Sequence, residues 1–290
     1  MSSTTRLLGA GGIGLAADVG GPEDGSPVLL FHGGGQTRHA WRNTLDVIAD
    51  RGWRVWSVDL RGHGESDWDD EGDYSFQAFA SDVRAIADSL SKPPVLIGAS
   101  LGGIASLAAA GGADDPAQGA RALVLVDVAP RIEQDGVKRI GDFMTSNLDG
   151  FASLEEVADL IAAYNPHRPR PTDLSGLKKN LRQRDDGRWV WHWDPRFVSG
   201  RFGSSDETRT SMVQPDRLER AARKLADVEL PVLLVRGRMS DLLSEEGAKE
   251  LLELVPHARY VDVADAGHMV AGDRNDLFTA AVLDFLDRLP

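Results

Sequence analysis

A serine in a glycine-flanked turn is the residue of this chain best placed to do chemistry. Residues 98–102 read Gly-Ala-Ser-Leu-Gly, directly after the apolar stretch 94–97 and before the small-residue stretch 104–110. A strand, a Gly-X-Ser-X-Gly turn and a helix in this order are typical of a nucleophile elbow, which exposes the serine hydroxyl at a helix N-terminus. Side chains at the flanking positions would collide with the returning helix. The pattern therefore predicts Ser100 as a nucleophile.

A serine needs a positioned base near neutral pH, and a third group must orient that base. His268 lies in the small-residue segment 264–269, just past the last expected strand, so we predict it as the base. Two aspartates follow expected strands: Asp127 comes directly after 122–126, and Asp241 comes a few residues after 232–235. We favour Asp241 as the orienting acid, because it gives the chain order Ser, Asp, His, and keep Asp127 as the alternative.

Acyl transfer also requires N–H donors aimed at the developing oxyanion. The residue after the nucleophile, Leu101, supplies one such amide. The glycine-rich loop at 33–35, which follows the first buried strand, is expected to supply the other through Gly34. A phosphate-binding role for these glycines is disfavoured, because no Lys-Ser/Thr pair follows them.

The elements that must position these residues follow from hydrophobic patterning. Short apolar runs alternate with helical patterns, which predicts an α/β fold with a mostly parallel sheet flanked by helices. A hairpin is expected from 6–8 and 13–18. The expected buried strands are 28–31, 54–58, 95–99, 122–126, 232–235 and 260–263, and the expected helices between them are 40–51, 76–90, 101–110, 244–254 and 277–289.

The alternation of strands and helices stops between 131 and 230. Helices are predicted there at 154–164, where Ser153 and Glu156 form a capping box, and at 174–184 and 217–226. A helical insertion of this kind normally covers the carboxyl edge of the sheet. We therefore expect a core formed by 1–130 and 231–290, with 131–230 as an all-helical cap.

Most candidate substrate-binding residues lie in the cap. Trp189, Trp191 and Trp193 stand at alternate positions of an extended segment, and Phe143 and Trp41 are further aromatic candidates. The tryptophans either pin the cap onto the core or form an aromatic wall over Ser100. An apolar, aromatic pocket would favour hydrophobic or aryl esters, lactones or thioesters.

Composition restricts the partners. A net charge of −13 argues against nucleic acid and anionic membranes, and no apolar run is long enough for a membrane span. No secretory signal is visible and cysteine is absent, so we expect a soluble cytoplasmic protein that uses a small-molecule substrate and needs no metal or cofactor. The stretch 131–230 is electrically balanced, but 167–188 is rich in basic residues. That segment is either a solvated helical face or an entrance that attracts carboxylate-bearing substrates.

In combination, these motifs resemble those of the α/β-hydrolase superfamily over about residues 5–290. The branch they are most similar to is the single-cap group of cofactor-free haloperoxidases, epoxide hydrolases and small esterases. The resemblance implies an eight-stranded sheet, a helical cap before the last two strands and a Ser100–Asp241–His268 triad. It rests on the segments 32–35, 59–66 and 98–103, on Asp241 and on the pair 267–268.

Two departures narrow the expected chemistry. Ser100 stands where epoxide hydrolases and haloalkane dehalogenases carry aspartate, which disfavours both of those reactions. Gly34 and Gly35 stand where haloperoxidase-like members commonly carry an aromatic residue and a proline. The prediction is a serine hydrolase that cleaves an ester-type bond of a small hydrophobic or aromatic substrate through an acyl-enzyme. The alternatives are perhydrolysis or C–C bond hydrolysis on the same triad, and a ligand-sensing homologue with slow turnover.

Overall fold

An eight-stranded sheet lies at the centre of the computed structural model, which describes residues 2–202 and 215–290. The strand order is β1-β2-β4-β3-β5-β6-β9-β10, and neighbouring strands are parallel from β4 to β10. The first two strands form the expected antiparallel hairpin, and β2 continues antiparallel onto β4. The strands are β1 Ser3–Leu8, β2 Gly14–Gly20, β3 Pro27–Phe31, β4 Arg54–Val58, β5 Val95–Ala99, β6 Ala122–Val126, β9 Val232–Gly237 and β10 Arg259–Val263.

Helices cover both faces of this sheet because successive residues of the central strands point to opposite sides. Leu29 and Leu96 belong to a buried cluster with α2, α3, α9 and α10, whereas Val28 and Val95 pack with α1 and α12. Both layers are built from buried aliphatic and aromatic side chains, which pack the helices against the two faces of the sheet. The helices around the sheet are α1 Thr44–Ala49, α2 Phe76–Asp88, α3 Leu101–Gly112, α4 Pro116–Gly119, α9 Pro215–Asp227, α10 Glu245–Leu254, α11 Val270–Asp273 and α12 Asn275–Leu286, with short 3-10 helices at Ala10–Gly12 and Arg38–Trp41.

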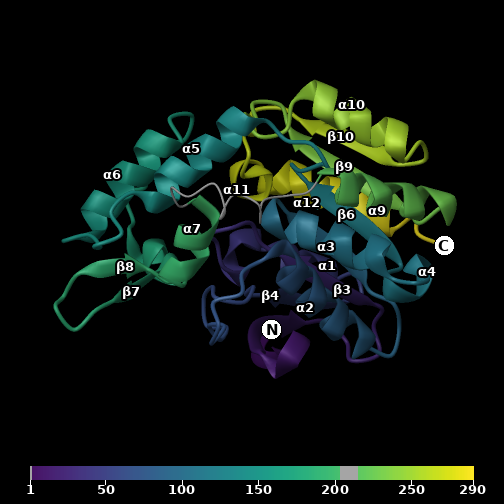
Figure 1. Ribbon diagram of the computed structural model, residues 1–290, viewed down its shortest axis with the longest axis horizontal. Helices are drawn as coiled ribbons and strands as arrows, with labels where there is room; N and C mark the ends of the chain where they lie inside the picture. Colours follow the sequence, from purple (N-terminus) through teal and green to yellow (C-terminus); the bar gives the residue numbers. More distant parts are fainter. Residues whose placement is uncertain (1, 203–214) are drawn as a thin grey trace.

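Between β6 and β9 the chain leaves the sheet. The elements α5, α6 and α7 and the hairpin β7–β8 gather on one side of the molecule, away from the central strands (Figure 1). We call this group the cap. Its elements are α5 Gln134–Thr145, α6 Leu154–Tyr164, the 3-10 helix Ser175–Asn180, β7 Leu181–Gln183, β8 Trp189–Trp191 and α7 Pro195–Phe202.

The cap differs from the expected all-helical insertion in one place. The predicted helix at 174–184 is wrong: a short 3-10 helix leads there into β7, which pairs antiparallel with β8. Leu181 of β7 packs with Phe151 and Val157 in a small apolar cluster that Trp189 also joins. Tertiary packing against these residues thus outweighs the local helical pattern.

The helix α9, which the sequence assigned to the cap, lies on the core. A Cβ on Gly111 of α3 would come within 2.5 Å of the Cβ of Ala221, so the two helices are in close contact. We keep the division into a core of 1–130 and 231–290 and a cap of 131–230 as a prediction for the chain as a whole. The last helix of that predicted cap, α9, nevertheless packs against the core.

Several local predictions are confirmed. The observed bounds of β4, β5 and β6 match the expected ones, and α6 begins and ends at the expected residues. At the start of α6, the amide of Glu156 donates to Ser153 Oγ at 3.3 Å, so the Ser153 half of the predicted capping box is confirmed. The other half differs, because Glu156 Oε2 accepts at 2.7 Å from the amide of Ala152, the residue before the N-cap. Within the described ranges, no helix is both long and apolar enough to cross a bilayer.

Candidate active site

Ser100 occupies a strained turn between β5 and α3. Its φ of 47° and ψ of −114° lie outside the usual regions for a residue with a side chain, and its amide donates to the carbonyl of Val126 at 3.1 Å. A Cβ on Gly98 would lie 2.4 Å from the backbone of Gly102, and one on Gly102 would lie 2.2 Å from the carbonyl oxygen of Phe31. Both glycines are therefore required by close backbone contact, as the sequence predicts for an elbow.

His268 is oriented by Asp127. Its Nδ1 lies 2.7 Å from Asp127 Oδ2, and the side chain of Asp127 has no exposed surface. The same carboxylate accepts from the amide of Gly237 at 2.9 Å and from Ser240 Oγ at 2.5 Å. Because Ala99 of β5 pairs with Val126 of β6, Ser100 and Asp127 are the next residues on two adjacent parallel strands. Ser100 and Asp127 thus occupy neighbouring positions at the carboxyl edge of the sheet.

The prediction of Asp241 as the orienting acid is wrong. Asp241 Oδ2 accepts from Arg139 Nη1 at 2.5 Å, and 39% of the aspartate side chain is exposed. The strand β9 ends at Gly237, and a turn closed by the Ser240 amide on the Gly237 carbonyl carries the chain outward. Ser240 is consequently the residue that reaches the inner carboxylate, whereas Asp241 lies at the rim.

The glycine loop after β3 has one amide available for an oxyanion. The amide of Gly33 donates to Gln36 Oε1 at 3.0 Å, and that of Gly35 donates to His63 Nε2 at 3.1 Å. Within the described residues, the intervening amide of Gly34 has no such acceptor. Leu101 is the first residue of α3, so its amide has no acceptor inside the helix. Both predicted donors are therefore free to bind a ligand oxygen.

The loop that contains His63 and Gly64 contacts both the glycine loop at 33–35 and the cap. His63 accepts the Gly35 amide, while the amide of Gly64 donates to Nδ1 of His192 in the cap at 2.5 Å. Arg182 of β7 donates to the carbonyl of Gly64. Burial lowers the pKa of His192 well below its usual value, so this contact is made by a neutral ring. His63 and Gly64 therefore support both the docking of the cap and the glycine loop at 33–35.

His32 has a structural role in this region. Its Nδ1 donates to the carbonyl of Gly33 at 2.7 Å, and its Nε2 accepts from the amide of Leu60 at 3.0 Å. Burial lowers the pKa of His32 to about 4, which keeps the ring neutral. The imidazole of His32 thus ties the glycine loop at 33–35 to the segment after β4.

An aromatic ladder runs through the cap towards the glycine loop. The rings of Tyr164 and Phe143 are 4.4 Å apart, those of Phe143 and Trp191 are 5.7 Å apart, and Trp191 stacks on Trp193 at 4.8 Å. Trp193 touches the loop, because a Cβ on Gly35 would lie 3.2 Å from its Cζ3. Three of the five predicted aromatic residues thus lie in one continuous row.

The other two aromatic candidates lie elsewhere. Trp41 is buried on the face of the sheet covered by α1 and α12, with its ring 5.7 Å from Phe278, so its assignment to the substrate wall is wrong. Trp189 packs in the small cap cluster, with Lys178 Nζ 5.8 Å from its ring. It belongs to the interior of the cap and forms no part of the ladder.

A cavity opens beside His268, between the cap and the core. Arg139 and the segment 164–167 line it from the cap, and Met239, Asp241 and the segment 267–269 line it from the core. Sequence reasoning missed Arg139 and Tyr164, which lie on two different helices and meet only in the folded cap. Burial and the charge of Asp241 raise the pKa of Tyr164 to about 12, so its hydroxyl stays neutral.

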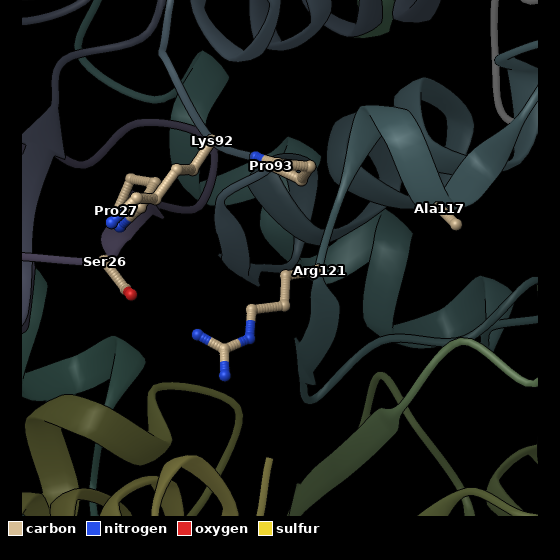
Figure 2. Close-up of a pocket in the computed structure, with 6 residues that line it drawn as sticks. All are labelled: Ser26, Pro27, Lys92, Pro93, Ala117 and Arg121. Atoms are coloured by element: carbon tan, nitrogen blue, oxygen red, sulfur yellow. The ribbon is translucent and has the colours of Figure 1, made fainter. Parts of the chain in front are cut away.

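A second cavity of about 280 Å³ lies at the opposite edge of the sheet (Figure 2). Its lining residues precede the parallel strands β3, β5 and β6, so it lies at their amino ends, away from Ser100. Open α/β sheets place their ligands at the carboxyl ends of the strands. Ser100, Asp127 and His268 all lie at that carboxyl edge.

Comparison with known proteins identifies the family of this chain. The family profile described as alpha/beta hydrolase fold matches residues 26–274. Esterase Rv0045c of Mycobacterium tuberculosis is 30% identical over 268 residues, which cover 90% of this chain and 82% of that protein. The 3-hydroxybutyrate-oligomer hydrolase of Cupriavidus necator is 27% identical over 259 residues, or 86% of this chain and 84% of the relative.

A solved structure supports the fold independently. That of E-2-(acetamidomethylene)succinate hydrolase superposes with a TM-score of 0.83 at 24% identity, covering 99% of this chain and 100% of the other. The chain therefore belongs to the α/β-hydrolase family. It is a hydrolase, and the two relatives compared above by sequence are an esterase and an oligomer hydrolase.

Proposed function

We propose that the protein is a serine hydrolase that cleaves carboxylesters, lactones or thioesters of small hydrophobic or aromatic acids through an acyl-enzyme on Ser100. The observation that carries this proposal is the 2.7 Å contact between His268 Nδ1 and the buried Asp127, one strand away from the strained Ser100. A buried carboxylate on Nδ1 fixes the imidazole tautomer whose Nε2 accepts a proton.

The reaction follows from these roles. Ser100 Oγ attacks the ester carbonyl carbon while His268 Nε2 takes the hydroxyl proton, and Asp127 stabilises the imidazolium that forms. The amides of Gly34 and Leu101 donate to the oxyanion, each contributing on the order of 3 kcal/mol to lowering the barrier. His268 then protonates the leaving alkoxide or thiolate. A water molecule activated by the same imidazole releases the acid and regenerates Ser100.

The aromatic ladder supports an apolar substrate. Phe143 and Trp191 are half-buried, and Trp193 closes the row against the glycine loop. Tyr164, at the other end of the row, lines the cavity beside His268, and an aromatic ring there favours acyl chains and aryl groups through burial and ring stacking. The esterase and oligomer hydrolase among the relatives are consistent with ester cleavage.

Covalent labelling tests the proposal. A fluorophosphonate probe is expected to label the wild-type protein, and Ser100→Ala is expected to lose both the label and at least 10³-fold of the turnover of a 4-nitrophenyl ester. Ser106→Ala is the matched control, because Ser106 lies on the same helix with its hydroxyl on the Gly102 carbonyl. Persistent labelling of the Ser100→Ala protein at another site, with turnover retained, would overturn the assignment.

A further inference from the structure

Arg139 is a cation at the rim of the cavity beside His268. We propose that it binds a carboxylate carried by the substrate, so that the preferred substrates are esters of acids with a second, anionic end. This inference rests on the proposed ester hydrolysis and specifies its substrate class. The carboxylate would lie at Arg139 while the scissile carbonyl lies at Ser100.

The guanidinium is already held in place for this task. Arg139 Nη1 donates to Asp241 Oδ2, its Nη2 donates to the carbonyl of Tyr164, and its Cζ lies 4.9 Å from the centre of the Tyr164 ring. Nevertheless 46% of the Arg139 side chain is exposed, so a ligand can reach it. A planar, pre-oriented guanidinium suits a carboxylate, because it loses little conformational freedom on binding.

Asp241 occupies the position that a substrate carboxylate would take. Among the described residues its carboxylate has Arg139 as its ion-pair partner, and both side chains are substantially exposed. Ion pairs of this kind in water are weak. A substrate carboxylate can therefore displace Asp241 or share the guanidinium with it at small cost.

The other charges near the cavity are already paired. His167 and Arg168 both contact Asp273, whose side chain is 2% exposed, and Asp127 is bound to His268. Arg139 is thus the lining cation whose partner is exchangeable. The aromatic ladder begins at Tyr164, directly under this guanidinium, and leads to the glycine loop. A substrate with an apolar chain and a carboxylate at its far end matches the order of a cation, a row of aromatic rings and the glycine loop.

A matched pair of esters tests the inference. The 4-nitrophenyl monoester of adipic acid and the 4-nitrophenyl ester of hexanoic acid differ only in a terminal carboxylate or methyl group. In Arg139→Met, kcat/KM for the adipate monoester is expected to fall about tenfold through KM, with the hexanoate ester within about twofold of wild type. In Asp241→Asn, kcat/KM for the adipate monoester is expected to rise a fewfold, because the competing carboxylate is gone.

The opposite signs of the two effects separate substrate binding from a structural role. Both substitutions break the same ion pair, so a merely structural pair would give changes in the same direction for both variants and both esters. Such parallel changes, or an unaltered ratio of the two esters in Arg139→Met, would overturn the inference while hydrolysis of hexanoate persists. Failure of wild type to cleave either ester, with no labelling of Ser100, would overturn the proposed function and this inference with it.

Discussion

Asp127 and Asp241 follow neighbouring parallel strands, β6 and β9, and have opposite surroundings. Asp127 is fully buried and accepts from His268, from the amide of Gly237 and from Ser240 Oγ. Asp241 is 39% exposed and pairs with Arg139 of the cap. One carboxylate is bound from three directions at the inner edge of the sheet, and the other makes a solvated ion pair at its rim.

The difference comes from how far each residue lies beyond its strand. Asp127 directly follows Val126, so the sheet itself fixes its backbone, with its amide donating to Val235 at 2.7 Å. Asp241 follows β9 only after an intervening turn. A carboxylate that stabilises an imidazolium is most effective where water is excluded, because charge interactions are then least screened. The inner position meets that condition.

Asp127→Asn is expected to have the largest effect. The new amide nitrogen would face His268 Nδ1, forcing the proton onto Nε2 and leaving no base for Ser100, so kcat should fall about 10³- to 10⁴-fold. Steady-state kinetics on a 4-nitrophenyl ester at constant pH measures this loss. Asp241→Asn, the same change one strand away, is the control. Comparable losses in the two variants would contradict the assignment of separate roles.

Much of the inner edge is predictable from sequence because it is local. The elbow needs a strand, Gly98, Gly102 and a helix, which are consecutive in the chain. Gly98 is required by contact with Gly102 itself, whereas Gly102 is required by contact with the end of the adjacent strand β3. Strands β5 and β6 are apolar runs buried on both faces, which gives their limits clearly. For the same reason Asp127, which directly follows β6, is placed at the carboxyl edge of the sheet by the sequence alone.

The rim is not predictable in this way because separate segments create it. The choice of Asp241 depended on chain order, which carries no information about the turn that moves it outward. The predicted helix at 174–184 became a 3-10 helix and a strand because Leu181 packs with Phe151. Trp41 was named as a substrate-wall candidate by residue type, but it fills the face of the sheet covered by α1 and α12, beside Phe278.

Ser240→Ala is expected to have an intermediate effect. The substitution removes the 2.5 Å bond to Asp127 and the acceptor for the amides of Leu242 and Leu243, at 3.1 and 3.2 Å. We expect kcat to fall about tenfold and stability to fall by about 1–2 kcal/mol, because a buried carboxylate loses one donor. Urea denaturation and ester kinetics measure the two effects separately.

Ser244→Ala is the matched control for that loss. Ser244 caps α10 by accepting from the amide of Gly247 at 3.1 Å, and its removal should cost about 1 kcal/mol of stability. It makes no contact with Asp127, so turnover should remain at the wild-type level. If the two variants lose activity to the same extent, the activity loss in Ser240→Ala reflects general destabilisation, and the orienting contact at Asp127 has no separate role.

Asp241→Asn is expected to have the smallest effect on an uncharged ester. The variant loses one exposed ion pair, so the free energy of unfolding should change by less than about 1 kcal/mol and kcat/KM for the hexanoate ester by less than about twofold. Thermal or urea unfolding and the hexanoate assay check both values. A large loss of kcat on this neutral substrate would mean that the rim carboxylate moves towards His268 during turnover. Both aspartates would then act on His268. Asp241 could reach the imidazole because an exposed side chain can reorient on the timescale of turnover, whereas burial holds the side chain of Asp127 in place.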